Sequence, residues 1–259
     1  MRPFPLEPEA LARFVRQCRE LEAGEWIFES LTSAEAAGLV AAGSDRGAGR
    51  PGAPGEPPGP RTAVESRPDL DGNRLPDDYG GLKEIALTCT RCRLAEGRTQ
   101  VVFSDGIPDA RVMVVGEAPG ANEDRTGLPF VGAAGKLLDL LLASVDLSRR
   151  SSVYICNVIK CRPPGNRNPR PDEIEACAPF LRSQIELVSP EVILAVGTFA
   201  GKLLSGSDRP LGKLRGEVYS YEGTPLVVTY HPAALLRNSG WTRATWEDFQ
   251  LLRKVLDQS

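Results

Sequence analysis

Histidine is the scarcest chemically versatile residue in this chain, because His231 is the only one among 259 residues. A single imidazole excludes metal sites built from several histidines. Serine-histidine hydrolase chemistry is not supported either, because no Gly-x-Ser-x-Gly nucleophile elbow accompanies His231. Any chemistry that needs a histidine must therefore be performed by His231.

Long apolar runs are absent as well. No stretch approaches 18 uninterrupted apolar residues, and residues 1–20 carry early acidic side chains without an apolar core. We therefore expect no membrane span, no signal peptide and a cytoplasmic location. In a reducing compartment the six cysteines are poor candidates for disulfides and better candidates for metal ligands.

A strongly basic composition, which is common in proteins that bind nucleic acid, is also missing, since the formal net charge is -3. The charge is unevenly distributed. Residues 1–79 contain nine Lys and Arg against fourteen Asp and Glu, whereas residues 80–259 contain twenty-two against twenty. The slightly basic region is compatible with an enzyme that meets DNA through a local patch, as it is with many other proteins.

The glycine and proline content divides the chain. From residue 43 to residue 60, eleven of eighteen residues are Gly or Pro, and no apolar periodicity returns before about Pro76. We therefore predict a helical segment of unknown role at 1–42, a flexible linker at 43–79 and a folded domain at 80–259.

Short apolar runs alternate with helical patterns in the predicted domain. Strands are predicted at 111–116, 153–158, 191–197 and 225–230. Helices are predicted at about 133–145, 171–188, 198–205 and 242–257. This alternation predicts an α/β fold with a mostly parallel, four-stranded sheet that is covered by helices on both faces. Ligands bind beyond the carboxyl ends of such strands. The loops concerned follow Gly116, Asn157, Gly197 and Tyr230.

Four of the cysteines form a candidate metal site. Cys89 and Cys92 are separated by two residues, and Cys161 and Cys177 lie further along the chain. Four thiolates suit zinc or an iron-sulfur cluster. The segment between Cys161 and Cys177 contains three arginines and several prolines, which favours a cluster-supported platform over a zinc ribbon. Cys18 and Cys156 are interpreted as packing residues.

The loop after the first predicted strand reads Gly116-Glu-Ala-Pro-Gly120, and a second glycine-rich segment follows at 127–135. These glycines permit close approach of the backbone to a ligand, although the loop matches neither a Walker loop nor a dinucleotide fingerprint. An ordinary strand-to-helix turn is the alternative. His231 follows the last predicted strand, where the fold places its ligands.

Together, these motifs resemble the family-4 uracil-DNA glycosylases. The segments that carry the resemblance are Gly116-Glu-Ala-Pro-Gly120, Pro129-Phe-Val-Gly132, Asn157-Val-Ile-Lys-Cys-Arg-Pro-Pro-Gly165 and His231-Pro-Ala-Ala-Leu-Leu-Arg237, in the order of the family. The resemblance covers about residues 80–257. It implies a three-layer α/β/α fold, a [4Fe-4S] cluster on the four cysteines, and excision of uracil from single- or double-stranded DNA by a monomer.

The resemblance also implies roles for individual residues at the base. Phe130 would stack on a flipped uracil, and Asn157 would bind its O4 and N3 edge. His231 would donate a hydrogen bond to O2 as the base leaves. Gly116 and Ala118 would complete the uracil pocket.

Roles in activating water and in binding DNA are implied more weakly. Ala118 stands where the best-known branch of the superfamily has an aspartate, so Glu117 becomes the first candidate to position water and Glu123 the second. For contacts to DNA the resemblance implies Leu235 or Leu236, Arg237 and Arg167.

Several alternatives compete with this interpretation. Family-5 enzymes usually have an apolar residue at Glu117, and a covalently trapping relative needs a second histidine, which this chain lacks. A non-catalytic iron-sulfur module that binds DNA would not need Phe130, Asn157 and His231 together. A nucleotide-binding α/β protein would use the loop that begins at Gly116.

Overall fold

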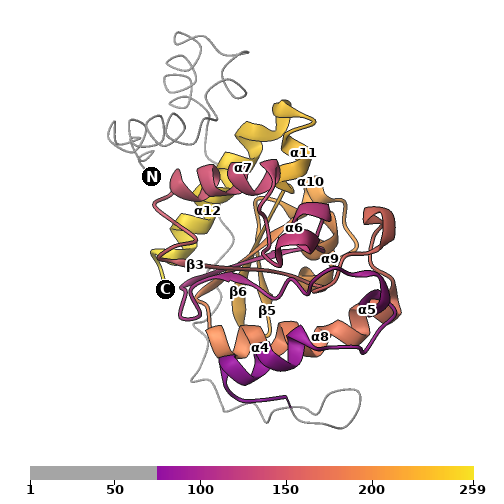
Figure 1. The fold of residues 1–259 in the computed structure, drawn as a ribbon. Coiled ribbons are helices and arrows are strands. Elements are labelled where there is room, and N and C mark those ends of the chain that lie inside the picture. The colour runs from indigo at the N-terminus through magenta and orange to yellow at the C-terminus, as the bar shows by residue number, and fades with distance from the viewer. Residues whose placement is uncertain (1–74) are drawn as a thin grey trace, which may run out of the picture. The chain divides into compact units, whose positions relative to one another are not determined.

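A computed structural model describes residues 75–259 (Figure 1). The predicted segment 1–42 and all but the end of the predicted linker lie outside the described residues. The described part forms one six-stranded sheet in the order β1-β3-β2-β4-β6-β5. The strands are β1 Asp105–Gly106, β2 Val112–Gly116, β3 Val153–Asn157, β4 Val192–Val196, β5 Val218–Tyr221 and β6 Thr224–Thr229.

The four strands predicted from the apolar runs are β2, β3, β4 and β6, and they pair in parallel. This confirms the mostly parallel α/β sheet. The sequence missed the two edge strands, β1 and β5, which are antiparallel to their neighbours. Because the four central strands are parallel, all four of their carboxyl ends lie at one side of the sheet.

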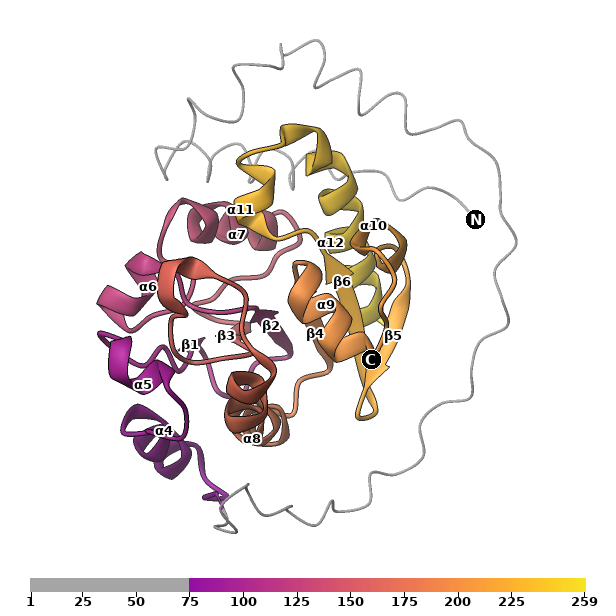
Figure 2. The ribbon, with the colours of Figure 1, turned by 90° about the vertical axis from the view of Figure 1, so that its right-hand side faces the viewer.

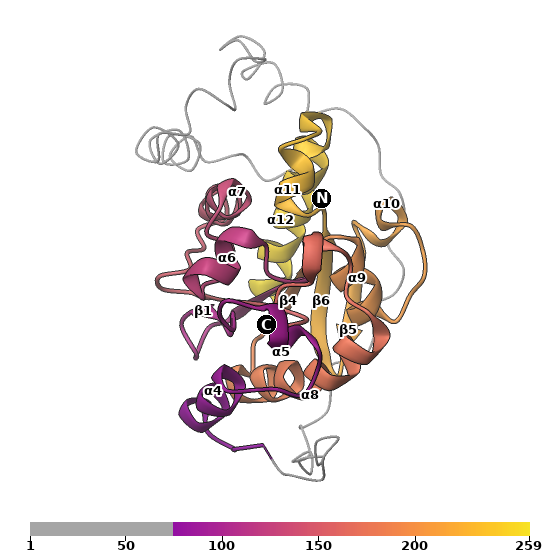
Figure 3. The ribbon, with the colours of Figure 1, turned by 45° about the vertical axis from the view of Figure 1, so that its right-hand side comes forward.

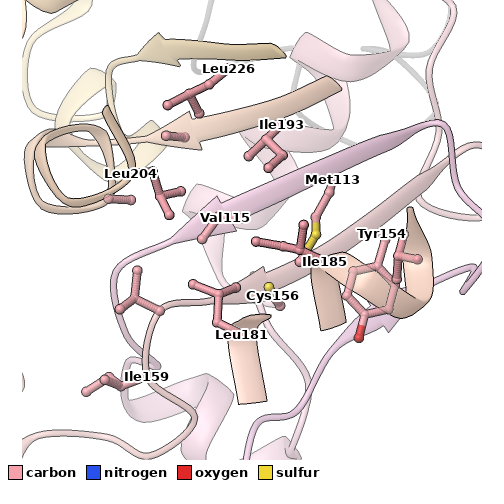
Figure 4. Close-up of a cluster of buried hydrophobic side chains, with 14 of the residues drawn as sticks. Met113, Val115, Tyr154, Cys156, Ile159, Leu181, Ile185, Ile193, Leu204 and Leu226 are labelled. Atoms are coloured by element: carbon pink, nitrogen blue, oxygen red, sulfur yellow. The ribbon is translucent and has the colours of Figure 1, made fainter. Parts of the chain in front are cut away.

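The central strands are buried on both faces, which explains their continuous apolar runs. Along β2, Met113 and Val115 belong to one hydrophobic cluster, whereas Val112 and Val114 belong to the other. Figure 4 shows Met113 and Val115 packed with Ile185 of helix α8. Because side chains alternate along a strand, one short segment supplies both cores.

Helices cover the two faces as separate layers (Figures 1 and 2). The helices are α4 Tyr79–Leu87, α5 Leu94–Gly97, α6 Ala121–Thr126, α7 Ala133–Ala143, η2 Pro164–Asn166, α8 Pro171–Val188, α9 Thr198–Ser205, α10 Leu211–Leu214, α11 Pro232–Leu235, η3 Ser239–Trp241 and α12 Thr242–Leu256. Helices α7 and α12 pack on one face of the sheet, and α8 and α9 pack on the other. The fold is therefore the three-layer sandwich implied by the resemblance.

The amino-terminal end of the described region is tied to the body of the domain. Asp78 caps helix α4 by accepting a hydrogen bond from the backbone N–H of Gly81, and the Tyr79 hydroxyl lies 2.7 Å from the hydroxyl of Ser104. Helix α4 thus begins one residue before the predicted boundary at residue 80. Within residues 75–259, no helix combines the length and apolar character that a bilayer crossing requires.

Candidate active site and cysteine cavity

A cleft of about 1170 Å³ lies at the carboxyl ends of the parallel strands. All four loops singled out in the sequence contribute to its lining, through Glu117, Asn157, Thr198 and His231. Figure 3 shows helices α6, α9 and α11, which border this region from different parts of the chain. The cleft exceeds the range of about 300–1000 Å³ that is usual for small-molecule pockets, so it has room for more than a single base.

Phe130 and Asn157 line the cleft, and Gly116 packs against both of them. A Cβ atom on Gly116 would lie 2.3 Å from Oδ1 of Asn157 and 2.8 Å from Cζ of Phe130, so no larger residue fits there. Asn157 is only 2% exposed, yet its side-chain amide makes no hydrogen bond within residues 75–259. A buried amide costs stability unless it finds partners, and this one is available to a ligand.

The loop that carries Phe130 is held from two sides. Phe130 has a φ of 54°, which is unusual for a residue with a side chain. Oε1 of Glu123 accepts hydrogen bonds from the backbone N–H groups of Val131 and Gly132, at 3.0 and 3.3 Å. On the far side, the guanidinium of Arg149 donates to the carbonyl oxygen of Phe130 at 3.0 Å. Glu123 and Arg149 thus fix the loop that presents the aromatic ring.

His231 is held in one orientation at the start of helix α11. Its Nδ1 accepts a hydrogen bond from the backbone N–H of Ala233 at 3.1 Å. An acceptor at Nδ1 carries no proton, so the proton of the neutral ring is at Nε2. Burial, and after it the charge of Arg237, lower the pKa of His231 to about 4, while Glu123 opposes the shift. His231 is therefore neutral near pH 7 and has one N–H to donate.

The imidazole and the aromatic ring face each other. The ring centroids of His231 and Phe130 are 5.5 Å apart with an interplanar angle of 25°. Gly197, at the end of β4, has a φ of +98°, and a Cβ there would lie 3.1 Å from Cβ of His231. Glycine at this position lets the loop after β4 approach the histidine closely.

Glu117 lines the same cleft and makes no side-chain hydrogen bond to any of residues 75–259. Burial raises the pKa of its carboxyl group. A half-buried carboxylate without a protein partner is suited to binding water. Glu123, the second candidate, is already engaged by two backbone N–H groups of the Phe130 loop.

The predicted DNA-binding residues differ in their surroundings. Leu235 is 4% exposed and packs in the core with helix α12, whereas Leu236 is 53% exposed. Leu235 could enter a duplex only by leaving the core, so its assignment is corrected and Leu236 remains. Arg237 lines the cleft, and so does Arg167, which also pairs with the buried Glu173.

The four predicted metal ligands line one small cavity that shares no lining residue with the cleft. Cys89, Cys92, Cys161 and Cys177 all contribute to its wall, and none of them forms a disulfide. No group of three or more His, Cys, Asp or Glu side chains in residues 75–259 is arranged to hold a single metal ion. Cys156, interpreted as a packing residue, is fully buried in the core.

Two N–H donors point at sulfurs in this cavity. The Arg98 guanidinium donates to Sγ of Cys161 at 3.3 Å, and the backbone N–H of Lys160 donates to Sγ of Cys177 at 3.4 Å. Donors of this kind stabilise thiolates that bind a metal centre.

Sequence reasoning missed the residues that support the site from behind. Arg149 and Lys160 were not singled out, although Lys160 is part of the Asn157-to-Gly165 motif. No local sequence pattern predicts the contacts of Arg149 and Lys160, because these contacts depend on side-chain directions and on residues far apart in the chain.

Comparison with known proteins agrees with this geometry. The family model described as the uracil DNA glycosylase superfamily matches residues 103–250. The type-4 uracil-DNA glycosylase of Sulfurisphaera tokodaii is 41% identical over 187 residues, which cover 69% of this chain and 85% of that protein. The corresponding Thermotoga maritima enzyme is 49% identical over 159 residues, covering 61% and 82%. A type-5 enzyme of Pyrobaculum aerophilum is 36% identical, covering 51% and 65%. The chain therefore belongs to the uracil-DNA glycosylase superfamily, within its type-4 family.

Proposed function

We propose that this chain hydrolyses the N-glycosidic bond of deoxyuridine in DNA, releasing uracil and leaving an abasic site. The proposal rests on one observation: three residues line the same cleft. They are Asn157 with an unpaired buried amide, Phe130 with its aromatic ring, and His231, which is neutral and has a free N–H. The cytoplasmic location and the monomeric state stay predictions.

Uracil recognition is assigned to Asn157 and Phe130. The amide of Asn157 donates to O4 and accepts from N3–H, whereas cytosine presents the reverse pattern. Phe130 covers one face of the base, and glycine at position 116 lets the backbone lie against both Phe130 and Asn157. The base reaches this pocket only after it is flipped from the stack, at a cost of a few kcal/mol.

Departure of the base is assigned to His231. As the glycosidic bond breaks, its electron pair moves onto uracil, and negative charge develops on O2. The Nε2–H of His231 donates to O2 and stabilises that charge, an effect of about 3 kcal/mol for one well-placed donor. The sugar is left with oxocarbenium character and is attacked by water.

The water is assigned to Glu117. Its carboxylate would accept a proton from the water as the oxygen bonds to C1′ of the sugar. Because base departure dominates such a reaction, a modest base suffices. Glu123 is the positioning residue for Phe130, as its two hydrogen bonds to the Phe130 loop indicate.

Glu117→Gln tests the assignment of the water. Burial raises the pKa of Glu117, and only the ionised form can accept a proton, so excision by the wild type should fall as the pH drops through that raised value. We expect the substitution to lower single-turnover excision about 10- to 100-fold and to abolish this acid limb. The measurement is a pH-rate profile of both proteins, and an unchanged limb would exclude Glu117 as the base.

Contacts to DNA are assigned to the cleft rim. Leu236 would occupy the space left in the duplex by the flipped base, and Arg237 and Arg167 would bind phosphates. Arg167 can do so while it is held by Glu173, because its side chain is still partly exposed.

The cysteine cavity is assigned to a [4Fe-4S] cluster. Its donor set is entirely thiol, and two N–H groups are in place to stabilise thiolates. A [4Fe-4S] cluster binds one thiolate at each iron, and four cysteines line this cavity. The cluster would be structural, because hydrolysis of a glycosidic bond transfers no electrons.

Cys161→Ser tests the cluster, with Cys156→Ser as a matched control. Both cysteines are buried and lie close together in the sequence, but only Cys161 lines the cavity. We expect Cys161→Ser to lower the folded yield and the absorbance near 400 nm, and Cys156→Ser to retain that absorbance. Equal iron content in the two variants would contradict the assignment of Cys161.

The proposed activity is tested with the full-length protein and a labelled single strand that contains one uracil. We expect strand cleavage after alkali treatment, which reports an abasic site, and none with thymine at the same position. A brown, folded protein that binds the strand but leaves uracil in place would instead be a non-catalytic DNA-binding module. Thermal stabilisation by nucleotides alone would favour the nucleotide-binding alternative.

A further inference from the structure

Lys160 is a buried lysine between the cysteine cavity and the uracil pocket. It is 2% exposed, and its Nζ donates to the backbone carbonyl oxygen of Asn157 at 2.6 Å. None of the ion pairs within residues 75–259 includes it. A buried cation without a negative partner is strongly destabilising, so its position calls for a compensating charge.

The cysteine sulfurs are the groups that can provide this charge. Lys160 lines the cavity formed by the four cysteines, and its own backbone N–H donates to Sγ of Cys177. Thiolates bound to a cluster would therefore supply the missing counter-charge.

The side chain of Lys160 also contacts Asn157, the residue that is proposed to bind the base. The edge strand β1 pairs only with Tyr154 and Ile155 of β3, so this ladder ends before Asn157. The Lys160 side chain returns three residues along the chain and binds the carbonyl oxygen at this strand end. It thereby fixes the peptide from which the Asn157 amide projects into the cleft.

We propose that Lys160 is a positioning residue that couples the cysteine-bound cluster to uracil recognition by Asn157. The proposal rests on the proposed function and on the proposed cluster. The cluster balances the positive charge of Lys160 on one side. On the other side, the hydrogen bond from Nζ of Lys160 to the carbonyl oxygen of Asn157 orients that residue. The cluster thus supports base selection through Lys160 as well as supporting the fold.

The first test is Lys160→Met in the full-length protein, which removes the charge and the donor at similar volume. A positive charge near a cluster favours the reduced form, so the reduction potential should fall. Loss of the bond to Asn157 should raise KM for uracil-containing strands about 10-fold while kcat changes less. A purely structural lysine would lower the melting temperature and leave KM at the wild-type value.

Arg98→Met is the matched control. Arg98 donates to Sγ of Cys161 from the same cavity but makes no contact with Asn157. This variant should also lower the reduction potential, while its KM stays closer to the wild-type value than that of Lys160→Met. Equal increases in KM for the two variants would overturn the specific role of Lys160.

A measurement on the wild type covers the case in which Lys160→Met fails to fold. Because Lys160 responds to the charge of the cluster, reduction of the cluster should change the affinity for uracil, and by reciprocity binding at Asn157 should shift the cluster potential. The experiment measures the cluster potential in complexes with two strands that differ at one nucleotide. One strand carries 2′-fluorodeoxyuridine, which resists glycosidic cleavage, and the other carries thymidine. A different potential in the two complexes supports coupling, and equal potentials overturn it. A wild type that lacks the cluster or does not excise uracil would instead overturn the proposed function itself.

Discussion

His231→Ala should fold and bind uracil-containing DNA, yet lose about 100-fold or more of its single-turnover cleavage rate. The reason is that Nε2–H is the donor positioned for the leaving base, and its loss leaves the developing charge on O2 without its partner. The alanine also removes the cap of helix α11, at a cost of about 0.5–2 kcal/mol of stability. The two effects need to be separated.

His231→Asn provides that separation. Asparagine is a good helix cap, so its side-chain oxygen can accept from the N–H of Ala233 as Nδ1 of His231 does. Its shorter amide does not reach the position of Nε2. We expect near-normal thermal stability with a cleavage defect as large as that of alanine. Restored cleavage in this variant would return His231 to a scaffold role.

The pH dependence follows from the lowered pKa of His231. Its folded value of about 4 lies below the ordinary 6.5, so the unfolded chain binds the proton more tightly. The wild type should therefore lose stability as the pH falls from 6.5 to 4, and His231→Asn should lack this contribution. Cleavage should show no titration of His231 above about pH 5. A cationic donor would instead make the rate rise as the pH falls through its pKa.

The central fold was predictable because its strands are buried on both faces. Continuous apolar runs such as Val112–Gly116 can hardly be anything but central strands once helices separate them. The edge strands lack this signal. Strand β1 has two residues, and β5 alternates exposed and half-buried positions in a polar context. Their pairing is set by neighbours rather than by their own composition.

The sequence predicted which residues line the cleft, while their roles toward a ligand stay predictions. Asn157 and His231 follow strands at their carboxyl ends, and the fold places such residues together. The choice between Leu235 and Leu236 was not predictable, because adjacent residues of a helix face different directions and the tertiary packing decides which one enters the core. The pairing of Glu123 with the Phe130 loop likewise required the folded backbone.

Asn157→Asp should lower uracil excision on the order of 10³-fold. The amide donates to O4 and accepts from N3–H, and an ionised carboxyl group has no proton to donate. The carboxylate would place a negative charge next to O4, at a residue that is only 2% exposed. Loss of a buried hydrogen bond combined with this repulsion is worth about 4 kcal/mol, which corresponds to roughly a thousandfold.

Asn168→Asp is the matched control, because it makes the same chemical change on an exposed residue in the lining of the same cleft. A charge added there is screened by water, so uracil excision should change less than 10-fold. If the two variants lose activity equally, the charge of the cleft matters and the amide of Asn157 does not read the base.

Asn157→Asp should also gain cytosine excision, which would not happen if Asn157 had only a structural role. Burial raises the pKa of a carboxyl group, so part of the Asn157→Asp population is protonated at mildly acidic pH. The protonated group donates to N3 of cytosine and accepts from its N4–H₂, a pattern that the amide presents only with its oxygen and nitrogen positions exchanged. Cytosine excision should therefore appear in this variant and increase as the pH falls, until protonation of His231 near pH 4 removes its neutral form. Abasic-site formation in strands with a single cytosine measures it, and a rate that is zero at every pH would show that base selection does not depend on the hydrogen-bond pattern of residue 157.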